Sequence, residues 1–305
     1  MEKIVALQAY RIWANTAGTL QNLDPEYLHD MRVATRRLRS ALRFIKNYFD
    51  EYFCEYVRNE LAWLAGYLGR VRDMDVFIET LEGVRMSLNL PEGPCTTVIA
   101  LLKKRHYSDR RLLNSAIKSK RTIGLMERLF DFDANAFYTN KDRELTLSDT
   151  AARIIRRELV RSRKMMKNAE EARTDERLHM LRIALKRLRY ACEFFSPLYD
   201  ERMRKAVRIA VKFQDCLGEH QDAIVAVKRL GSLYFDIPRK LKDTGAGSCI
   251  ASIIDHFKIQ ADLKKEEFLN IRGEFDLISN LLHEVIDPIE NSMPMELNHA
   301  QDDNT

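Results

Sequence analysis

The sequence contains one pattern twice, about 150 residues apart. The segment YLHDMRVATRRLRSALRFI at 27–45 aligns with RLHMLRIALKRLRYACEFF at 177–195. A second match follows in the same order, LGRVRDMD at 68–75 with LGEHQDAI at 217–224. Two ordered matches in nearly the same register predict a duplicated helical unit of about 145 residues. The chain is therefore expected to fold as two related halves.

Apolar residues recur with a period near 3.6 along the chain, which has only 11 glycines and 7 prolines. This period predicts an all-α fold. Each half has the length of a four-helix bundle, so we expect two pseudo-symmetric, four-helix-bundle-like repeats. The predicted boundaries are 1–140 for the first repeat, 150–286 for the second and 287–305 for a flexible tail, together forming one domain.

The helices of the first half are placed by their apolar period and by the residues that interrupt it. Pro25 stands at a first helical position, and NLPEGP at 89–94 interrupts the period. The segment 131–149 loses the period and marks the boundary between the halves. The expected helices run over 4–21, from Pro25 to about Phe49, over 51–82 as one helix or a pair, and from Thr96 to about Phe130.

The first copy of the pattern predicts a helix with one apolar face and one basic face. Like charges such as Arg32 and Arg36 at i,i+4 destabilise a helix by roughly 0.2–0.5 kcal/mol per pair. No acid offsets them within the stripe, so we expect an anion from outside the helix. The first basic stripe comprises His29, Arg32, Arg36, Arg39 and Arg43, with Arg37 projecting to the side.

The second copy carries a similar stripe with one difference. Glu193 stands where the first copy has Arg43, so one end of the second stripe is weaker and the two copies are not fully equivalent. Arginine suits phosphate because its planar guanidinium gives directional, charge-assisted hydrogen bonds. The second basic stripe comprises His179, Arg182, Lys186, Arg187 and Arg189.

Further residues are candidates for a supporting role. The aspartates of the L-G-x-x-x-D motif, Asp73 and Asp222, could orient stripe arginines or serve only within their own helices. Its glycines, Gly69 and Gly218, most simply permit close helix approach or a bend. Additional basic lining, with an ordinary solvated surface as the alternative, could come from Lys103, Arg110, Arg121, Arg153 and Arg157.

A metal centre is weighed because Glu26 and Glu176 each precede a stripe histidine by three residues, the spacing of di-iron carboxylate bundles. Both glutamates lie in a first helical turn, where the helix dipole favours an acid. Arg32 or Arg182 then follows each histidine by one turn and would repel a cation. We therefore expect no metal and no cofactor.

Composition limits the remaining classes. The net charge of +5 is too mild to identify a partner. Five scattered cysteines argue against a disulfide framework and a zinc site, and suit a reducing compartment. The N-terminal residues do not resemble a signal peptide, and no apolar run is long enough to span a bilayer. We expect a cytoplasmic protein without a membrane association.

The doubled H-x-x-R-x-x-x-R/K-R-x-R helix followed by L-G-x-x-x-D resembles the CHAD family, all-helical domains named for their histidine motif. The resemblance implies two pseudo-symmetric bundles that bind inorganic polyphosphate in a basic central cleft or channel, with no demonstrated catalytic activity. Many members are fused to a triphosphate-tunnel domain carrying E-x-E-x-K, a motif that this sequence lacks. We expect a stand-alone version.

The leading hypothesis is non-catalytic binding of inorganic polyphosphate or another polyanion, with association with polyphosphate granules as one setting. The alternative is a nucleic-acid-binding or scaffold protein that uses the same basic surface; a metal-dependent phosphohydrolase is less favoured. The stripes lack the interleaved aromatic residues on which bases stack. The sequence leaves open the oligomeric state, the protein partners, the preferred chain length, the biological purpose, and whether the histidines act as charged ligands or structurally.

Overall fold

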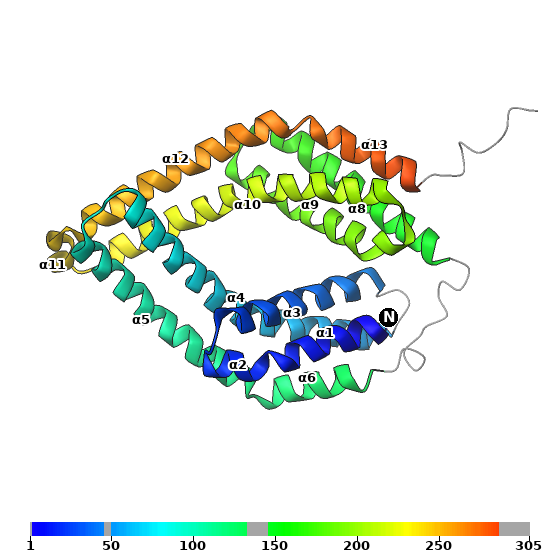
Figure 1. Cartoon of the computed structure of the whole chain (residues 1–305), viewed down its shortest axis with the longest axis horizontal. Coiled ribbons are helices and arrows are strands. Elements are labelled where there is room, and N and C mark those ends of the chain that lie inside the picture. The colour runs from blue at the N-terminus through cyan, green and yellow to red at the C-terminus, as the bar shows by residue number, and fades with distance from the viewer. Residues whose placement is uncertain (1, 46–49, 133–145, 287–305) are drawn as a thin grey trace, which may run out of the picture. The chain divides into compact units, whose positions relative to one another are not determined.

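The computed structural model describes residues 2–45, 50–132 and 146–286. Over these ranges the chain is built of helices joined by short connections, and no strand occurs in them (Figure 1). This confirms the predicted all-α fold. The predicted tail at 287–305 lies outside the described residues.

The helices of the first half largely follow the predicted segments. α4 is one long helix, which settles the open choice over 51–82. The segment predicted as one helix up to Phe130 is instead two, because the Ser119 side chain accepts a hydrogen bond from the amide of Thr122 and caps a new helix. The elements are α1 (Glu2–Ala14), α2 (Thr16–Gln21), α3 (Pro25–Ile45), α4 (Glu51–Ser87), α5 (Glu92–Ile117) and α6 (Lys120–Phe130). The predicted end of the basic helix near Phe49 falls on residues outside the described ranges.

The second half begins with a helix whose start is fixed by a capping box between Thr146 and Asp149. Its elements are α8 (Leu147–Ala172), α9 (Asp175–Phe195), η2 (Ser196–Leu198), α10 (Glu201–Asp236), α11 (Arg239–Leu241), η3 (Lys242–Ala246), α12 (Gly247–Ile271) and α13 (Glu274–Ile286). α9 begins after Thr174, whose side chain accepts a hydrogen bond from the amide of Arg177.

The chain forms two compact units. The first comprises Met1–Leu145 and Glu219–Lys265, and the second comprises Thr146–Gly218 and Glu266–Thr305. The chain passes from one unit to the other within α10 and again within α12. These units are defined by contacts, whereas the predicted repeat boundaries are defined by sequence correspondence, so the repeat boundaries stay a prediction.

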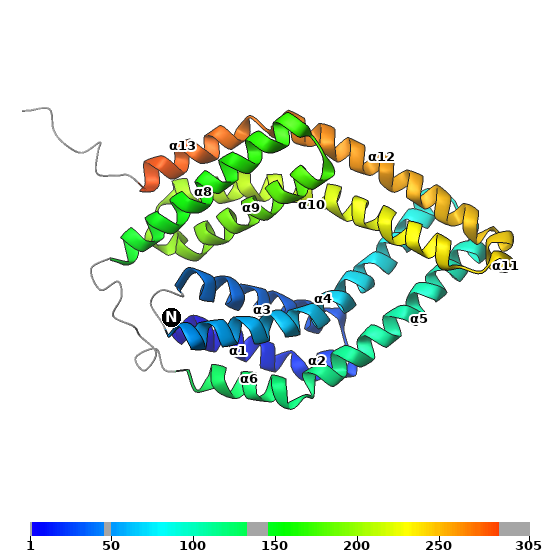
Figure 2. The same ribbon diagram turned by 180° about the vertical axis from the view of Figure 1, so that it is seen from behind.

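In the first unit, α3 packs against both α1 and α4, and α4 runs beside α5 (Figures 1 and 2). A core cluster joins α4 and α5 to the later helices of this unit, with Leu81, Leu102, Leu230 and Ile250 at most 3% exposed. The basic helix is therefore held on a packed scaffold.

In the second unit, α8 packs against α9, and α13 packs against α8 (Figure 2). The ring of Phe213 meets those of Phe268 and Phe275 edge to face, each at a centroid distance of 6.5 Å. These aromatic contacts join α10, α12 and α13 in one core.

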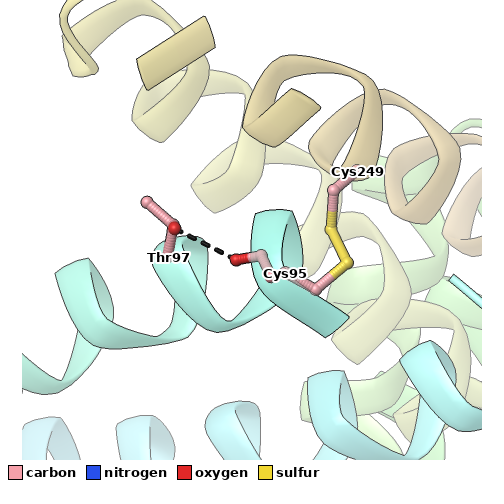
Figure 3. The surroundings of a disulfide bond; sticks show 4 residues. Cys95, Thr97 and Cys249 are labelled. Atoms are coloured by element: carbon pink, nitrogen blue, oxygen red, sulfur yellow. Dashed lines mark hydrogen bonds between the residues drawn. A yellow bond between two sulfur atoms is a disulfide. The ribbon is translucent and has the colours of Figure 1, made fainter. Parts of the chain in front are cut away.

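The sequence argument against a disulfide framework missed one bridge, which joins two of the five cysteines. Cys95, near the start of α5, and Cys249, near the start of α12, form a disulfide with a Cα–Cα distance of 5.8 Å (Figure 3). Packing of the core cluster brings together residues 154 positions apart, so spacing along the chain could not reveal the pair. The other three cysteines, Cys54, Cys192 and Cys216, are free and buried. The argument for a reducing compartment rested on unpaired cysteines and loses that support.

Candidate polyanion-binding helices

The basic stripe of α3 lies on a helix whose opposite face is firmly packed. Met31, Ala34, Leu38 and Leu42 are each at most 1% exposed. Arg37 is exposed, which agrees with its predicted direction to the side. The stripe residues themselves are all partly buried: His29, Arg32, Arg36, Arg39 and Arg43.

α9 reproduces the burial of α3. Each position from 21 to 42 is buried, partly buried or exposed in the same way as the position 150 residues later, with the single exception of Arg37 and Arg187. Arg187 is partly buried, unlike its exposed counterpart. The other residues of the second stripe are partly buried as well: His179, Arg182, Lys186 and Arg189. This agreement supports the duplication predicted from sequence.

Asp73 of α4 contacts the first stripe. Nη2 of Arg32 donates a hydrogen bond to Oδ1 of Asp73 over 3.0 Å, and both side chains remain accessible. The contact that sequence reasoning raised for Asp73 is therefore present in the structure. Asp222 is exposed at the corresponding position of α10. What either aspartate does for a ligand stays a prediction.

The middle of the first stripe is crowded with positive charge. Partial burial, followed by repulsion from Arg58 on α4, lowers the pKa of Arg39. Such a pair of guanidinium groups is relieved by an anion placed near both. Sequence reasoning did not single out Arg58, because acids and bases alternate along α4 and only the packing of α4 against α3 brings it close to the stripe.

The corresponding part of the second stripe is largely neutralised. Nε of Arg189 donates to Oε1 of Glu193 over 2.6 Å, and Nη1 donates to Oε1 of Gln214 over 3.1 Å. The Gln214 amide donates in turn to the carbonyl of Leu185. Arg189 is thus occupied by an acid and an amide.

An acid of the same unit lies beside most of the other basic candidates. The Glu60 carboxylate raises the pKa of Arg121 through a hydrogen bond, and the guanidinium stacks 4.2 Å from the Trp63 ring centroid. Arg153 is exposed. The ion pairs are Lys103–Glu82 at 3.3 Å, Arg110–Asp75 at 3.5 Å, Arg121–Glu60 at 2.5 Å and Arg157–Glu158 at 3.1 Å. That these residues line a binding site stays a prediction, but their neutralisation weakens the case.

Metal ligation gains no support from the part of the chain that the structure describes. There, no three His, Cys, Asp or Glu side chains are grouped so that they could hold a metal ion. Glu26, one half of the weighed Glu-x-x-His pair, lies 3.8 Å from Arg72. A cationic neighbour of this kind suits a carboxylate that is not a metal ligand.

The helices and their basic faces define the class of protein, which is an all-helical domain with positively charged faces. The model of the CHAD domain family matches residues 3–231, and the chain therefore belongs to the CHAD family. Two uncharacterized proteins of Mycobacterium tuberculosis, from strains CDC 1551 and H37Rv, are each 27% identical to it over 209 residues. That match covers 67% of this chain and 39% of each relative's length.

Two solved structures share the fold. The crystal structure of the CHAD domain from the plant Ricinus communis has a TM-score of 0.65 and 24% identity, covering 92% of this chain and 90% of the plant chain. PptA from Streptomyces chartreusis has a TM-score of 0.63 and 18% identity, covering 89% of this chain and 98% of the other. In the described part of the chain, no helix is both long and apolar enough for a membrane span.

Proposed function

We propose that this chain binds inorganic polyphosphate through the basic faces of α3 and α9, without catalysing its turnover. One observation carries the proposal: a stripe of one charge sign, held partly buried on a packed helix, occurs twice with nearly the same burial. Membership of the CHAD family also supports the proposal, because the resemblance to that family implies polyphosphate binding.

The geometry of a stripe suits a linear polyanion. From His29 to Arg43 the helix rises by about 21 Å at 1.5 Å per residue, with a basic group every three or four residues. A chain of phosphates can contact several of these groups at once, so affinity should rise with chain length. Release of counterions should make binding weaken steeply with salt.

The absence of catalysis is proposed from the donor groups near the stripes. Phosphohydrolases commonly gather carboxylates that hold divalent metal beside the phosphate. The acids described close to the stripes, Asp73 and Glu193, instead pair with stripe arginines. Metal-dependent release of phosphate by the purified protein would contradict this part of the proposal.

The test is a titration of the purified chain with long-chain polyphosphate at low and high salt, with duplex DNA as competitor. The double variant Arg36→Ala/Arg39→Ala should bind at least about tenfold more weakly, which corresponds to about 1.4 kcal/mol, while its helix content stays unchanged. The matched control is Arg111→Ala/Lys118→Ala, which removes the same charge from two exposed positions, one on α5 and one directly after its last residue, and should have a small effect.

Each outcome has a distinct meaning. Tight, salt-sensitive binding that DNA does not displace, lost only in the stripe variant, supports the proposal. Equal competition by DNA would favour the nucleic-acid alternative. Equal losses in both double variants would show that net charge, and not the stripe, determines binding.

A further inference from the structure

Two glycines inside long helices lie beneath an arginine of a basic stripe. A Cβ atom added at Gly69 of α4 would lie 4.0 Å from Nε of Arg32, and one added at Gly218 of α10 would lie 3.8 Å from Nε of Arg182. Arg32 and Arg182 are corresponding residues of the two copies. An added Cβ has nothing within 4 Å at the other glycines of α4 and α10, which are Gly66, Gly83 and Gly231.

A glycine inside a helix is destabilising relative to alanine, so a glycine that meets a specific neighbour calls for a reason. At Gly69 an alanine Cβ would only reach ordinary contact distance from Arg32, whereas a longer side chain would enter the space that the guanidinium occupies. The sequence suggested that these glycines permit close approach or a bend. The structure shows that what approaches is the arginine side chain of the basic helix.

The guanidinium group at the end of the Arg32 side chain is also fixed by a contact. Its Nη2 donates to Oδ1 of Asp73, one helical turn beyond Gly69. The backbone at Asp73 is fixed in turn, because Nη1 of Arg229 donates to the carbonyl of Asp73 over 3.2 Å and its guanidinium lies 5.4 Å from the Phe77 ring centroid.

An acid beside an anion-binding arginine should weaken anion binding through its charge. Its presence is explained if it orients the guanidinium. We propose that Gly69 and Asp73 form a seat that fixes the direction of Arg32 before phosphate arrives, and that Gly218 provides the same space for Arg182. This inference rests on the proposed function, and Gly69 and Asp73 are positioning residues in it.

The sign of one substitution separates positioning from simple charge. Asp73→Ala removes a negative charge next to the stripe, so electrostatics alone predicts tighter binding of polyphosphate. If Asp73 orients the Arg32 guanidinium, its removal should instead weaken binding, and we expect binding about fivefold weaker. The control is Glu79→Ala, which removes an exposed acid from the same helix and should leave affinity unchanged or slightly higher. Tighter binding by Asp73→Ala would overturn the seat.

The role of Gly69 is tested with substitutions that keep the helix folded. Gly69→Leu should weaken binding about fivefold while the melting temperature stays the same or rises, since leucine favours a helix over glycine. Gly69→Ala should keep the affinity because its Cβ fits. Gly66→Leu, one turn earlier, should gain stability without losing affinity. Equal affinity of the two leucine variants would overturn the role of Gly69.

A readout without ligand keeps the two proposals separate. In the nuclear magnetic resonance spectrum of the free protein, the signal of the Arg32 Nη2 proton that is donated to Asp73, assigned by its loss in Arg32→Lys, should show slow exchange with water. It should exchange rapidly in Asp73→Ala and in Gly69→Leu. A wild-type chain that shows a seated Arg32 but binds no polyphosphate would overturn both proposals. Binding with a freely exchanging Arg32 would overturn the seat alone.

Discussion

Breaking the Cys95–Cys249 disulfide is expected to lower the free energy of unfolding of the first compact unit by several kcal/mol. The bridge joins residues 154 positions apart. A loop of that length lowers the entropy of the unfolded chain by about 17 cal/mol/K in the chain-entropy model, or about 5 kcal/mol near room temperature. We expect about 3–5 kcal/mol, because compact denatured chains lose less entropy than the model assumes.

The assay compares one chain with and without its bridge. Both cysteines are at most 3% exposed, so the reductant should be applied to the unfolded chain before refolding. Urea unfolding is followed by tryptophan fluorescence, because Trp13 and Trp63 both belong to the first compact unit, as the disulfide does. The double variant Cys95→Ala/Cys249→Ala is the control, since reductant should not change its stability.

Two results would refute this reasoning. The unfolded chain should show three reactive thiols before reduction and five after it, given five cysteines and one bridge. Five thiols in protein purified without reductant would refute the pairing. A correct thiol count with the same unfolding midpoint before and after reduction would refute the energetic argument.

Two further predictions concern the charge of α9 and the buried thiols. Glu193→Gln should strengthen polyphosphate binding about two- to threefold in the same titration, because it frees Arg189 from an ion pair at 2.6 Å; weaker binding would mean that Glu193 orients Arg189. Burial raises the pKa of Cys54 to about 11 and that of Cys192 to about 12, so at mildly alkaline pH few of these thiols are ionised. Alkylation should therefore be slow in the native protein and fast in denaturant, and rapid native labelling followed by mass spectrometry would contradict the packing at these sites.

The features of the fold that depend on the periodicity of apolar residues were predicted from the sequence. The apolar positions of α3, such as Met31 and Leu38, recur at helical spacing, and they are the residues that the structure buries. Burial along α9 follows that along α3, which agrees with the duplication expected from the sequence, while the two repeats stay a prediction. Helix caps were predicted only in part, because Ser119 cannot be distinguished from other surface serines until its hydrogen bond to the Thr122 amide is known.

What the sequence could not predict depends on contacts between distant residues. Arg121 pairs with Glu60 across 61 positions, and Arg39 meets Arg58 only because α3 packs against α4. No spacing rule encodes such contacts, yet they determine which basic residues keep charge available for a ligand. The pairing of Cys95 was missed for the same reason.

The disulfide also gives the covalent chain a topology. It closes a ring from Cys95 to Cys249, in which α9 lies inside and α3 lies outside. A single protease cut inside the ring opens it without separating the pieces, whereas a cut between α3 and Cys95 leaves the N-terminal piece attached by non-covalent contacts alone. Electrophoresis with and without reductant should therefore distinguish the two cuts. The second basic helix is tethered at both ends, and the first at only one.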